Sequence, residues 1–246
     1  EINSRLGFVF KGGLIPYLRN IPLASRLNKT FQVPVTVLND GDAAGLAEAR
    51  IGNLQDCDCG ATFVLGTGVG LALTSNGSLI STWNLKDYLR WPSLGEKQVT
   101  PEQKQYQTEI LRHGISSLVQ NLGSAVNFVA NASRLLELPE EDGVQVFEVL
   151  EAGHHEELQD LFASYCREIA ILIYNLQSLV RLEKVTIGGG ISSQSLLLEA
   201  INHQYKSLME ESGEQRFSLV EIQAARYHNS SNLLGAVCHF NILENH

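Results

Sequence analysis

The sequence has no cluster of Lys and Arg and no long apolar run, and each absence excludes a class of protein. The formal net charge is −9 at pH 7, whereas a surface that binds nucleic acid needs clustered positive charge. No stretch approaches the roughly 20 apolar residues that cross a bilayer, and no charged-then-apolar signal segment opens the chain. We therefore expect a cytoplasmic protein in which this segment binds neither nucleic acid nor a membrane.

The four cysteines follow no spacing that is typical of a disulfide framework. Residues 57–60 (CDCG) have the lettering of half a zinc site, but a structural zinc site needs four ligands and no second pair lies nearby. His154-His155 lies near acidic residues at an expected helix start. The sequence favours a solvated loop at 57–60 over a zinc site, and we assign no residue as a metal ligand.

The 246 residues that are present predict a folded protein of one large domain or two modest ones, because 44% are hydrophobic and 18% are charged. Short apolar runs typical of strands lie at 33–38, 61–65, 71–75, 184–187 and 217–222. Helical spacing of apolar residues lies at 23–31, 42–51, 101–136, 157–182, 193–208 and 231–241. Strands and helices alternate, with glycine-rich turns after strands. The fold class is therefore α/β, and in such folds ligands bind where strands end.

The first glycine-rich turn follows the predicted strand 61–65. Its glycines let the backbone approach a ligand closely, and its free N–H groups and one hydroxyl would suit phosphate oxygens. The residues concerned are Gly66, Thr67, Gly68 and Gly70. The turn is not a dinucleotide fingerprint, because a strand follows it, and it lacks the ending of a Walker loop. A tight hairpin between two strands explains the turn equally well.

The second glycine-rich turn follows the predicted strand 184–187 and precedes a predicted helix. It consists of Gly188, Gly189 and Gly190. A helix N-terminus adds N–H donors and a positive dipole end, which suit the phosphates or the ring edge of a nucleotide. A purely structural turn is the alternative. Two such turns in one chain favour a nucleotide-binding protein.

Residues 35–51 (VTVLNDGDAAGLAEARI) predict a buried strand that ends in two carboxylates and an amide before a helix. Asp42 fits a helix N-cap or a first-turn acid. Asp40 would lie before the cap, at the carboxyl end of the strand, where side chains face a crevice. A carboxylate there can accept a proton from a substrate hydroxyl, which Asn39 can orient by donating and accepting hydrogen bonds. Asp40 is therefore the candidate general base, and Asn39 is a candidate substrate ligand.

Four motifs together resemble the ROK family of sugar kinases and transcriptional repressors. Residues 39–48 (NDGDAAGLAE) resemble its Asn-Asp-Ala-Asn-Ala-Ala motif, and residues 65–70 (LGTGVG), followed by the hairpin NGSL, resemble its second phosphate loop. Residues 185–192 (VTIGGGIS) are similar to its adenosine-side glycine motif, and residues 229–236 (NSSNLLGA) to its C-terminal motif. The likeness covers nearly the whole chain and is strongest to sugar and β-glucoside kinases of Gram-positive bacteria.

The resemblance implies transfer of a phosphoryl group from ATP, with Mg²⁺, to a hydroxyl of a hexose or glucoside. Asp40 would take the proton, Asn39 would bind the sugar, Gly66–Gly70 would hold the terminal phosphates, and Gly188–Gly190 would face the adenosine. It also implies the actin-like ATPase (ribonuclease H-like) fold and a homodimer. Of its two lobes, residues 1–50 would be the remainder of an incomplete N-terminal lobe and residues 51–246 the C-terminal lobe.

The sequence departs from the family pattern at three places. The family's first phosphate loop is absent, and the chain begins at Glu1 without Met, so we expect the chain as given to be a poor kinase. The sugar-binding Gly-Glu-X-Gly-His/Tyr segment is degenerate; Glu96, which follows Gly95, is the preferred substitute, and Asp87 is the alternative. The family's downstream zinc cluster is missing.

Two other functions stay open at this point. The chain could be the sugar-sensing part of a ROK-type repressor whose DNA-binding helices lie upstream, or it could be an inactive, truncated relic. The retained Asp40 favours the kinase, because a repressor has no chemical need for a base.

Overall fold

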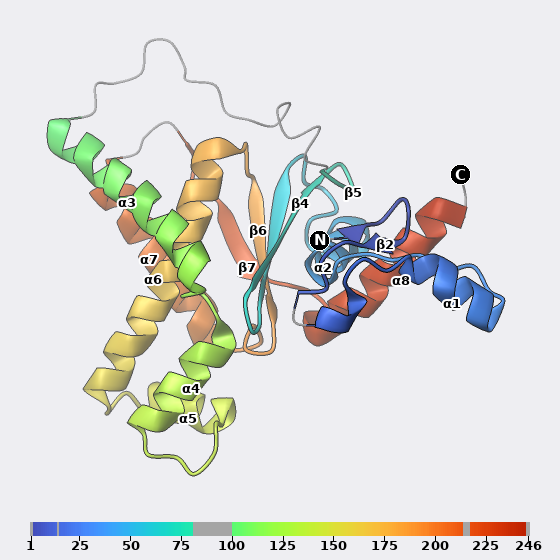
Figure 1. The fold of residues 1–246 in the computed structure, drawn as a ribbon. Coiled ribbons are helices and arrows are strands. Elements are labelled where there is room, and N and C mark those ends of the chain that lie inside the picture. The colour runs from blue at the N-terminus through green and yellow to red at the C-terminus, as the bar shows by residue number, and fades with distance from the viewer. Residues whose placement is uncertain (1, 14, 81–99, 214–216, 245–246) are drawn as a thin grey trace.

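A mixed five-stranded sheet forms the centre of the molecule in the computed structural model, which describes residues 2–13, 15–80, 100–213 and 217–244 (Figure 1). The strand order is β5-β4-β3-β6-β7. The strands are β3 (Gly60–Leu65), β4 (Val69–Ser75), β5 (Ser78–Leu79), β6 (Lys184–Gly189) and β7 (Glu221–Ala224). β3 is antiparallel to β4 and parallel to β6, with Leu65 opposite Gly189. The two glycine-rich turns therefore emerge side by side at the carboxyl ends of two neighbouring strands.

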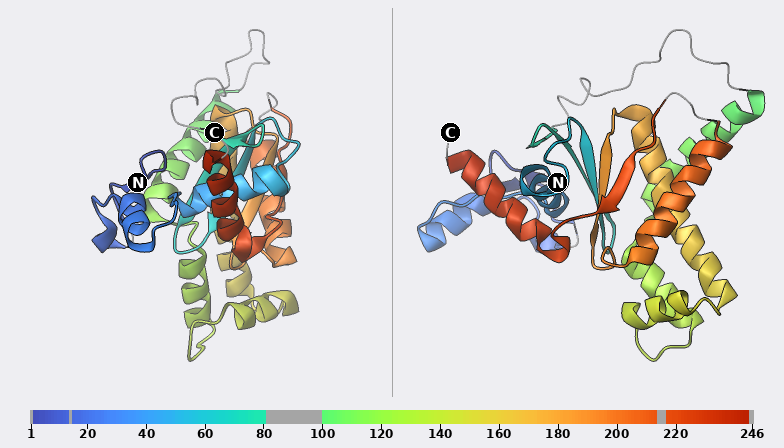
Figure 2. Two further views of the ribbon diagram at one scale, coloured as in Figure 1. Left: turned by 90° about the vertical axis from the view of Figure 1, so that its right-hand side faces the viewer. Right: turned by 180° about the vertical axis from the view of Figure 1, so that it is seen from behind.

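Helices cover both faces of this sheet (Figures 1 and 2). On one face lie α3 (Pro101–Gln120), α6 (Glu156–Leu179) and α7 (Ser195–Glu211), and the layer continues into α4 (Ala125–Leu135) and α5 (Gly143–Ala152). On the other face lie α2 (Asp40–Ile51) and α8 (Ser231–Glu244). A sheet covered in this way buries both sets of alternating side chains, which explains the near-continuous apolar strands in the sequence.

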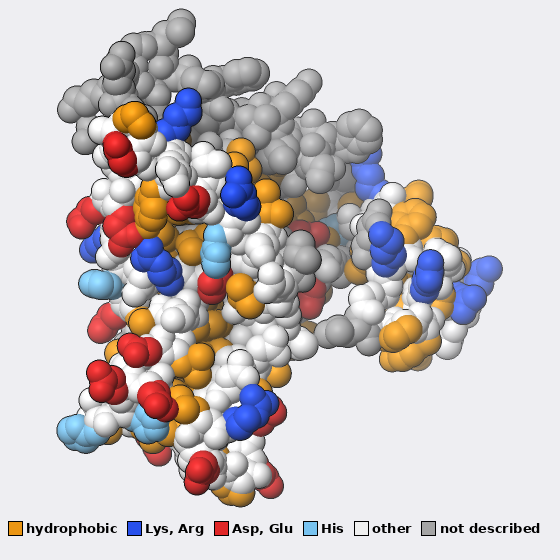
Figure 3. All heavy atoms as spheres, turned by 60° about the vertical axis from the view of Figure 1, so that its left-hand side comes forward, with side chains coloured by type: hydrophobic (Ala, Val, Ile, Leu, Met, Phe, Trp, Pro, Cys, Tyr) orange, Lys and Arg blue, Asp and Glu red, His pale blue; other side chains and the backbone are white. Residues whose placement is uncertain are grey.

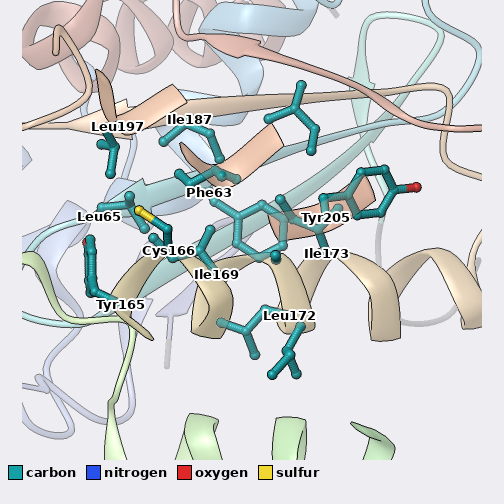
Figure 4. Packing of buried hydrophobic residues seen from close by; sticks show 14 of the residues in the cluster. Phe63, Leu65, Tyr165, Cys166, Ile169, Leu172, Ile173, Ile187, Leu197 and Tyr205 are labelled. Carbon is teal, nitrogen blue, oxygen red and sulfur yellow. The ribbon is translucent and has the colours of Figure 1, made fainter. Parts of the chain in front are cut away.

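The main hydrophobic core lies between the sheet and α6. Phe63 and Leu65 of β3 and Ile187 of β6 point toward α6, where Cys166 and Ile169 meet them (Figure 4). The intervening strand residues face α2; there Thr62 and Thr186 form a buried hydrogen bond of 2.8 Å. Because side chains alternate along each strand, apolar residues face α6, and the hydrogen-bonded pair Thr62 and Thr186 faces α2.

The N-terminal segment is small and carries little core. It comprises β1 (Ile2–Asn3), β2 (Phe8–Val9), the short 3₁₀ helix η1 (Pro16–Leu18) and α1 (Leu23–Phe31), which has no buried residue. Its basic residues are Arg5, Lys11, Arg19, Arg26 and Lys29. In Figure 3 this segment is the smaller part at the right, where Lys and Arg gather, whereas Asp and Glu lie mainly over the helical part.

Several predicted elements differ from the structure. The predicted strand 33–38 is wrong: the segment has no regular secondary structure and pairs with no strand in the described part of the chain, and Val33 is 49% exposed. The predicted helix 101–136 is two helices, because Asn121 takes a left-handed φ of 58° and Ser124 caps α4. The last strand lies at 221–224, slightly later than predicted, and α5 was not predicted. None of the described helices is long and apolar enough to cross a bilayer.

Candidate active site

The first turn of α2 is built by Asn39. The Asn39 side-chain oxygen accepts hydrogen bonds from the backbone N–H of Gly41 at 3.0 Å and of Asp42 at 3.3 Å, so Asn39 is the N-cap. The helix therefore begins at Asp40, two residues before the predicted start. Asp42 is a first-turn acid and not the cap, and Asp40 is the first helical residue and does not precede the cap.

The two acids of this turn differ in exposure. Asp40 is exposed, and its Oδ1 accepts a hydrogen bond of 2.9 Å from the N–H of Gly41. Asp42 is half-buried, and burial raises the pKa of its carboxyl, with a further contribution from the negative charge of Asp40. Asp42 lines a cavity of about 810 Å³ together with His239 of α8 and Arg50. Asp40 is the more exposed of the two acids.

Asp40 lies next to the first glycine-rich turn through a close backbone contact. A Cβ atom placed on Gly41 would lie 3.5 Å from the Cα of Gly70, and one placed on Gly70 would lie 3.5 Å from the Cα of Gly41. The start of β4 therefore packs against the first turn of α2 with two glycines face to face. The structure thus brings together the candidate base and the candidate phosphate loop.

The 66–70 turn is fixed by helices on the other face of the sheet. Asn121 donates from Nδ2 to the carbonyl of Thr67 at 2.6 Å, and the Ser124 hydroxyl donates to the carbonyl of Gly66 at 3.3 Å. The N–H of Gly66 donates to the carbonyl of Gly68 at 2.9 Å, so it is not one of the free donors that the sequence predicted. Thr67 is exposed, and a Cβ on Gly66 would meet nothing within 4 Å. The loop is rigid at its base and open at its tip.

The second turn shows where glycine is required. Gly189 has a φ of 104°, and a Cβ there would lie 2.1 Å from the carbonyl oxygen of Leu65. Gly190 faces open space, since a Cβ there would meet nothing within 4 Å. The helix predicted at 193–208 begins at Ser195, two residues later, so its N-terminal N–H groups are not contiguous with the glycines. This turn therefore offers a ligand the exposed backbone at Gly190 and not the N-terminus of α7.

Sequence reasoning missed the anchors of the site. Asn121 and Ser124 lie in residues 121–124 (NLGS), a group of turn-forming residues that interrupts the helical spacing and so was a usable signal. Glu48 was seen only as part of a motif, yet it is 0% exposed and accepts backbone hydrogen bonds from outside its helix. The candidates Glu96 and Asp87 lie outside the described residues.

Residues 57–60 are not a solvated loop throughout. Cys57 and Cys59 are both buried, and burial together with the neighbouring Glu183 raises the pKa of the Cys57 thiol to about 12. A thiol of this kind is a poor source of the thiolate that zinc binds. In the described part of the chain, no three His, Cys, Asp or Glu side chains are grouped so that they could hold a metal ion.

A family model described as the ROK family matches residues 7–84 and 112–241. The chain belongs to the ROK family. A β-glucoside kinase from Listeria monocytogenes is 27% identical over 241 residues, which is 97% of this chain and 76% of the relative. The prediction of the family is confirmed.

Solved structures share the fold. The Lmo2764 protein from Listeria monocytogenes superposes with a TM-score of 0.73 and 26% identity, over 99% of this chain and 78% of that one. A ROK family glucokinase from Streptomyces griseus, in complex with glucose and AMPPNP, gives a TM-score of 0.61 and 22% identity, over 89% and 72%. A ROK family transcriptional regulator gives a TM-score of 0.53 and 17% identity, over 98% and 60%. This protein therefore has the actin-like ATPase fold of the ROK family, as predicted.

Proposed function

We propose that this ROK protein transfers a phosphoryl group from ATP to a hydroxyl of a sugar, with Asp40 as the general base. The observation that carries the proposal is the contact of Gly41 with Gly70, because it puts an exposed carboxylate beside an open glycine loop. Phosphoryl transfer needs this juxtaposition, since most of its catalysis is positioning and neutralisation of charge.

Asp40 would accept the proton of the attacking sugar hydroxyl. The carboxylate is exposed and receives a hydrogen bond from the adjacent N–H of Gly41, which holds one of its oxygens and leaves the other for the substrate. The oxygen of the Asn39 amide is already used by the helix cap, so Asn39 would bind the sugar through its N–H₂ group alone. The proposed sugar is a hexose or a glucoside; the kinase relative from Listeria monocytogenes is a β-glucoside kinase.

The residues of the two glycine turns fit a nucleoside triphosphate. Gly66 and Gly190 face open space, and the exposed hydroxyl of Thr67 can donate to a phosphate oxygen. We assign the terminal phosphates to Gly66, Thr67, Gly68 and Gly70, and the adenosine to Gly188, Gly189 and Gly190. Mg²⁺ would arrive with ATP, mostly held by phosphate oxygens and water, and would neutralise charge as the phosphoryl group moves. A kinase of this type works where ATP is supplied, which is the cytoplasm.

The test is a coupled assay of ADP release by the complete gene product with ATP, Mg²⁺ and a panel of sugars that includes β-glucosides, glucose and amino sugars. We expect ADP release with at least one sugar. Asp40→Asn should lower kcat by about 10²- to 10⁴-fold, the usual contribution of general-base catalysis, while sugar affinity changes little.

Asp42→Asn is the matched control, because it removes the other acid of the same turn without a change of shape. It should keep kcat within a few-fold of the wild type. Equal turnover by Asp40→Asn would remove Asp40 from the role of base. No ADP release with any sugar, combined with sugar binding in calorimetry, would favour the sugar-sensing regulator; a ROK family transcriptional regulator has the same fold.

A further inference from the structure

Glu48 is a buried carboxylate that the proposed chemistry does not use. It lies in the same helix as Asp40, and its side chain is 0% exposed. Burial raises the pKa of its carboxyl, although hydrogen bonds from backbone N–H groups and the charge of Arg226 act against this. A buried acid is costly unless it is fully hydrogen-bonded, so its partners show what it does.

Both oxygens of Glu48 accept hydrogen bonds from backbone N–H groups outside α2. Oε1 accepts from the N–H of Arg226 at 2.8 Å, and Oε2 accepts from the N–H of Asn53 at 2.9 Å. Only a carboxylate presents two acceptors in this arrangement, because a glutamine would place an N–H₂ donor against one of the two N–H groups. The side chain thus connects α2 to the segment 224–227, which begins with the last residue of β7.

Three further hydrogen bonds join the end of α2 to the same segment. Asn53 donates from Nδ2 to the carbonyl of Ala224 at 2.9 Å, and the Tyr227 hydroxyl donates to the carbonyl of Ile51 at 2.9 Å. Arg226 donates from Nη1 to the carbonyl of Ile51 at 3.5 Å. The connection is therefore a cluster of bonds with the Glu48 carboxylate as its buried centre.

The segment 224–227 in turn packs on the glycine triplet. The N–H of Ala225 donates to the carbonyl of Ile187 at 2.8 Å, and the Ala225 Cβ would lie 3.5 Å from a Cβ on Gly188. One end of α2 is thus fixed to the strand that carries Gly188–Gly190, and the other end carries Asp40. Asp40 and Glu48 are eight residue steps apart, which is about 12 Å along the helix axis.

We propose that Glu48 is a positioning residue that holds Asp40 in place relative to the Gly188–Gly190 turn. The inference rests on the proposed function, in which Asp40 takes the proton of the sugar hydroxyl and Gly188–Gly190 contact the adenosine of ATP. A helix moves as a rigid unit, so a tilt of about 5° at Glu48 would displace Asp40 by about 1 Å. A misplacement of that size can cost about 10²-fold in rate.

The first measurement is hydrogen–deuterium exchange of the complete gene product, which does not depend on activity. Glu48→Gln should increase exchange in three separate peptides, one from α2, one covering residues 186–192 and one covering residues 222–227. The control is Asn202→Ala, which removes hydrogen bonds of Asn202 to Leu198 and Ile222 on the opposite face of the sheet. It should leave exchange in α2 unchanged. Unchanged exchange in α2 of Glu48→Gln would overturn the proposed coupling between α2 and the segment 224–227.

The second measurement is kinetic. Glu48→Gln should lower kcat by about tenfold or more while KM for sugar and for ATP stays within about twofold, because binding groups remain but the base is displaced. In the Asp40→Asn background the same change should have almost no further effect, since it acts through Asp40. An equal loss in both backgrounds, or a loss no greater than that of Asn202→Ala, would overturn the positioning role.

A milder variant keeps the test usable if Glu48→Gln folds poorly. Tyr227→Phe deletes only the hydroxyl that bonds to Ile51, and it should reduce kcat a few-fold with the same dependence on Asp40. Normal kcat in Tyr227→Phe together with unchanged exchange in α2 would count against the proposal. If the wild type releases no ADP with any sugar, the proposed function fails, and so does the kinetic role of Glu48, while the exchange experiment still decides whether the coupling between α2 and the segment 224–227 exists.

Discussion

The two sides of the candidate active site are held in place by different forces. The glycine turns emerge from β3 and β6, two neighbouring strands in the interior of the sheet, whose apolar residues lie in the largest core. Asp40 and its cap Asn39 follow the segment 33–38, which has no regular secondary structure, is at least partly exposed, and pairs with no strand among the described residues. Burial of β3 and β6 therefore fixes the glycine turns, the proposed phosphate side of the site. The position of Asp40, the proposed base side, depends instead on the Asn39 cap, the contact of Gly41 with Gly70 and the hydrogen bonds of Glu48.

The first prediction concerns the core beneath the glycine turns, where a substitution should reduce stability most. Phe63→Ala removes a side chain that is 2% exposed in the core under the turn, and it should lower the free energy of unfolding by ~3–5 kcal/mol. Val37→Ala, in the half-exposed segment that leads to Asp40, should cost less than about 1 kcal/mol. Urea unfolding followed by circular dichroism gives both values. Similar losses at the two positions would show that the two sides do not differ.

The second prediction separates two neighbours within the glycine triplet. Gly189→Ala should cost ~3 kcal/mol or more, because its φ is 104° and the new Cβ would lie 2.1 Å from the Leu65 carbonyl oxygen. Gly190→Ala should change stability by less than about 0.5 kcal/mol, since its Cβ enters open space. If that space holds the nucleotide, Gly190→Ala should instead raise KM for ATP. Thermal unfolding and ATP titrations distinguish the two effects, and a stable Gly189→Ala would contradict the strain.

The third prediction concerns the Asn39 cap, which fixes the first turn of α2 next to Asp40. Asn39→Ala removes the cap of α2 and should cost ~1 kcal/mol, because the N–H of Asp42 loses its acceptor and that of Gly41 keeps only Asp40 Oδ1. Asn39→Asp keeps an acceptor and should keep most of that stability. It loses the N–H₂ donor, so it should raise KM for the sugar if Asn39 binds the sugar. Chemical unfolding with sugar titrations separates the two roles, and normal KM in Asn39→Asp would leave Asn39 as a cap only.

The same division explains what the sequence could predict. The strands of the buried sheet and both glycine turns were visible, because burial on two faces leaves continuous apolar runs that end in glycine. The family was visible through four motifs, and its model matches the chain. The start of α2 was misplaced by two residues, because Asn39 and Asp42 are both good caps and only the hydrogen bonds decide between them.

Contacts between residues far apart in the chain could not be predicted from the sequence. Nothing local shows that Gly41 will face Gly70, or that Asn121 will bond to Thr67. The segment 33–38 has the composition of a strand, yet strand formation requires a neighbour, and pairing is a tertiary property. The domain boundary at residue 50, the homodimer and the sugar ligand Glu96 stay predictions.

The smallest expected effect sharpens the contrast between the acids of α2. The pKa of Asp42 is raised by burial and by Asp40, so its ionised form destabilises the fold at neutral pH, even though a helix N-terminus favours negative charge. Stability from this group is full below the ordinary Asp pKa of 3.8 and is lost as the pH rises through the raised value. Asp42→Asn should therefore stabilise the protein by a few tenths of a kcal/mol, roughly, at pH 7, and the gain should vanish toward pH 4.

Asp142 offers the opposite sign in the same chain. Its carboxylate caps α5 and accepts hydrogen bonds from Gln145 and from the N–H of Val144, and these bonds lower its pKa. A lowered pKa adds stability above the unfolded value, so Asp142→Asn should lose stability at pH 7 and lose less as the pH falls. Unfolding midpoints of both variants between pH 4 and 7 give the two slopes. Slopes of the same sign would mean that Asp42 is not penalised by burial, and that Asp40 does not repel it.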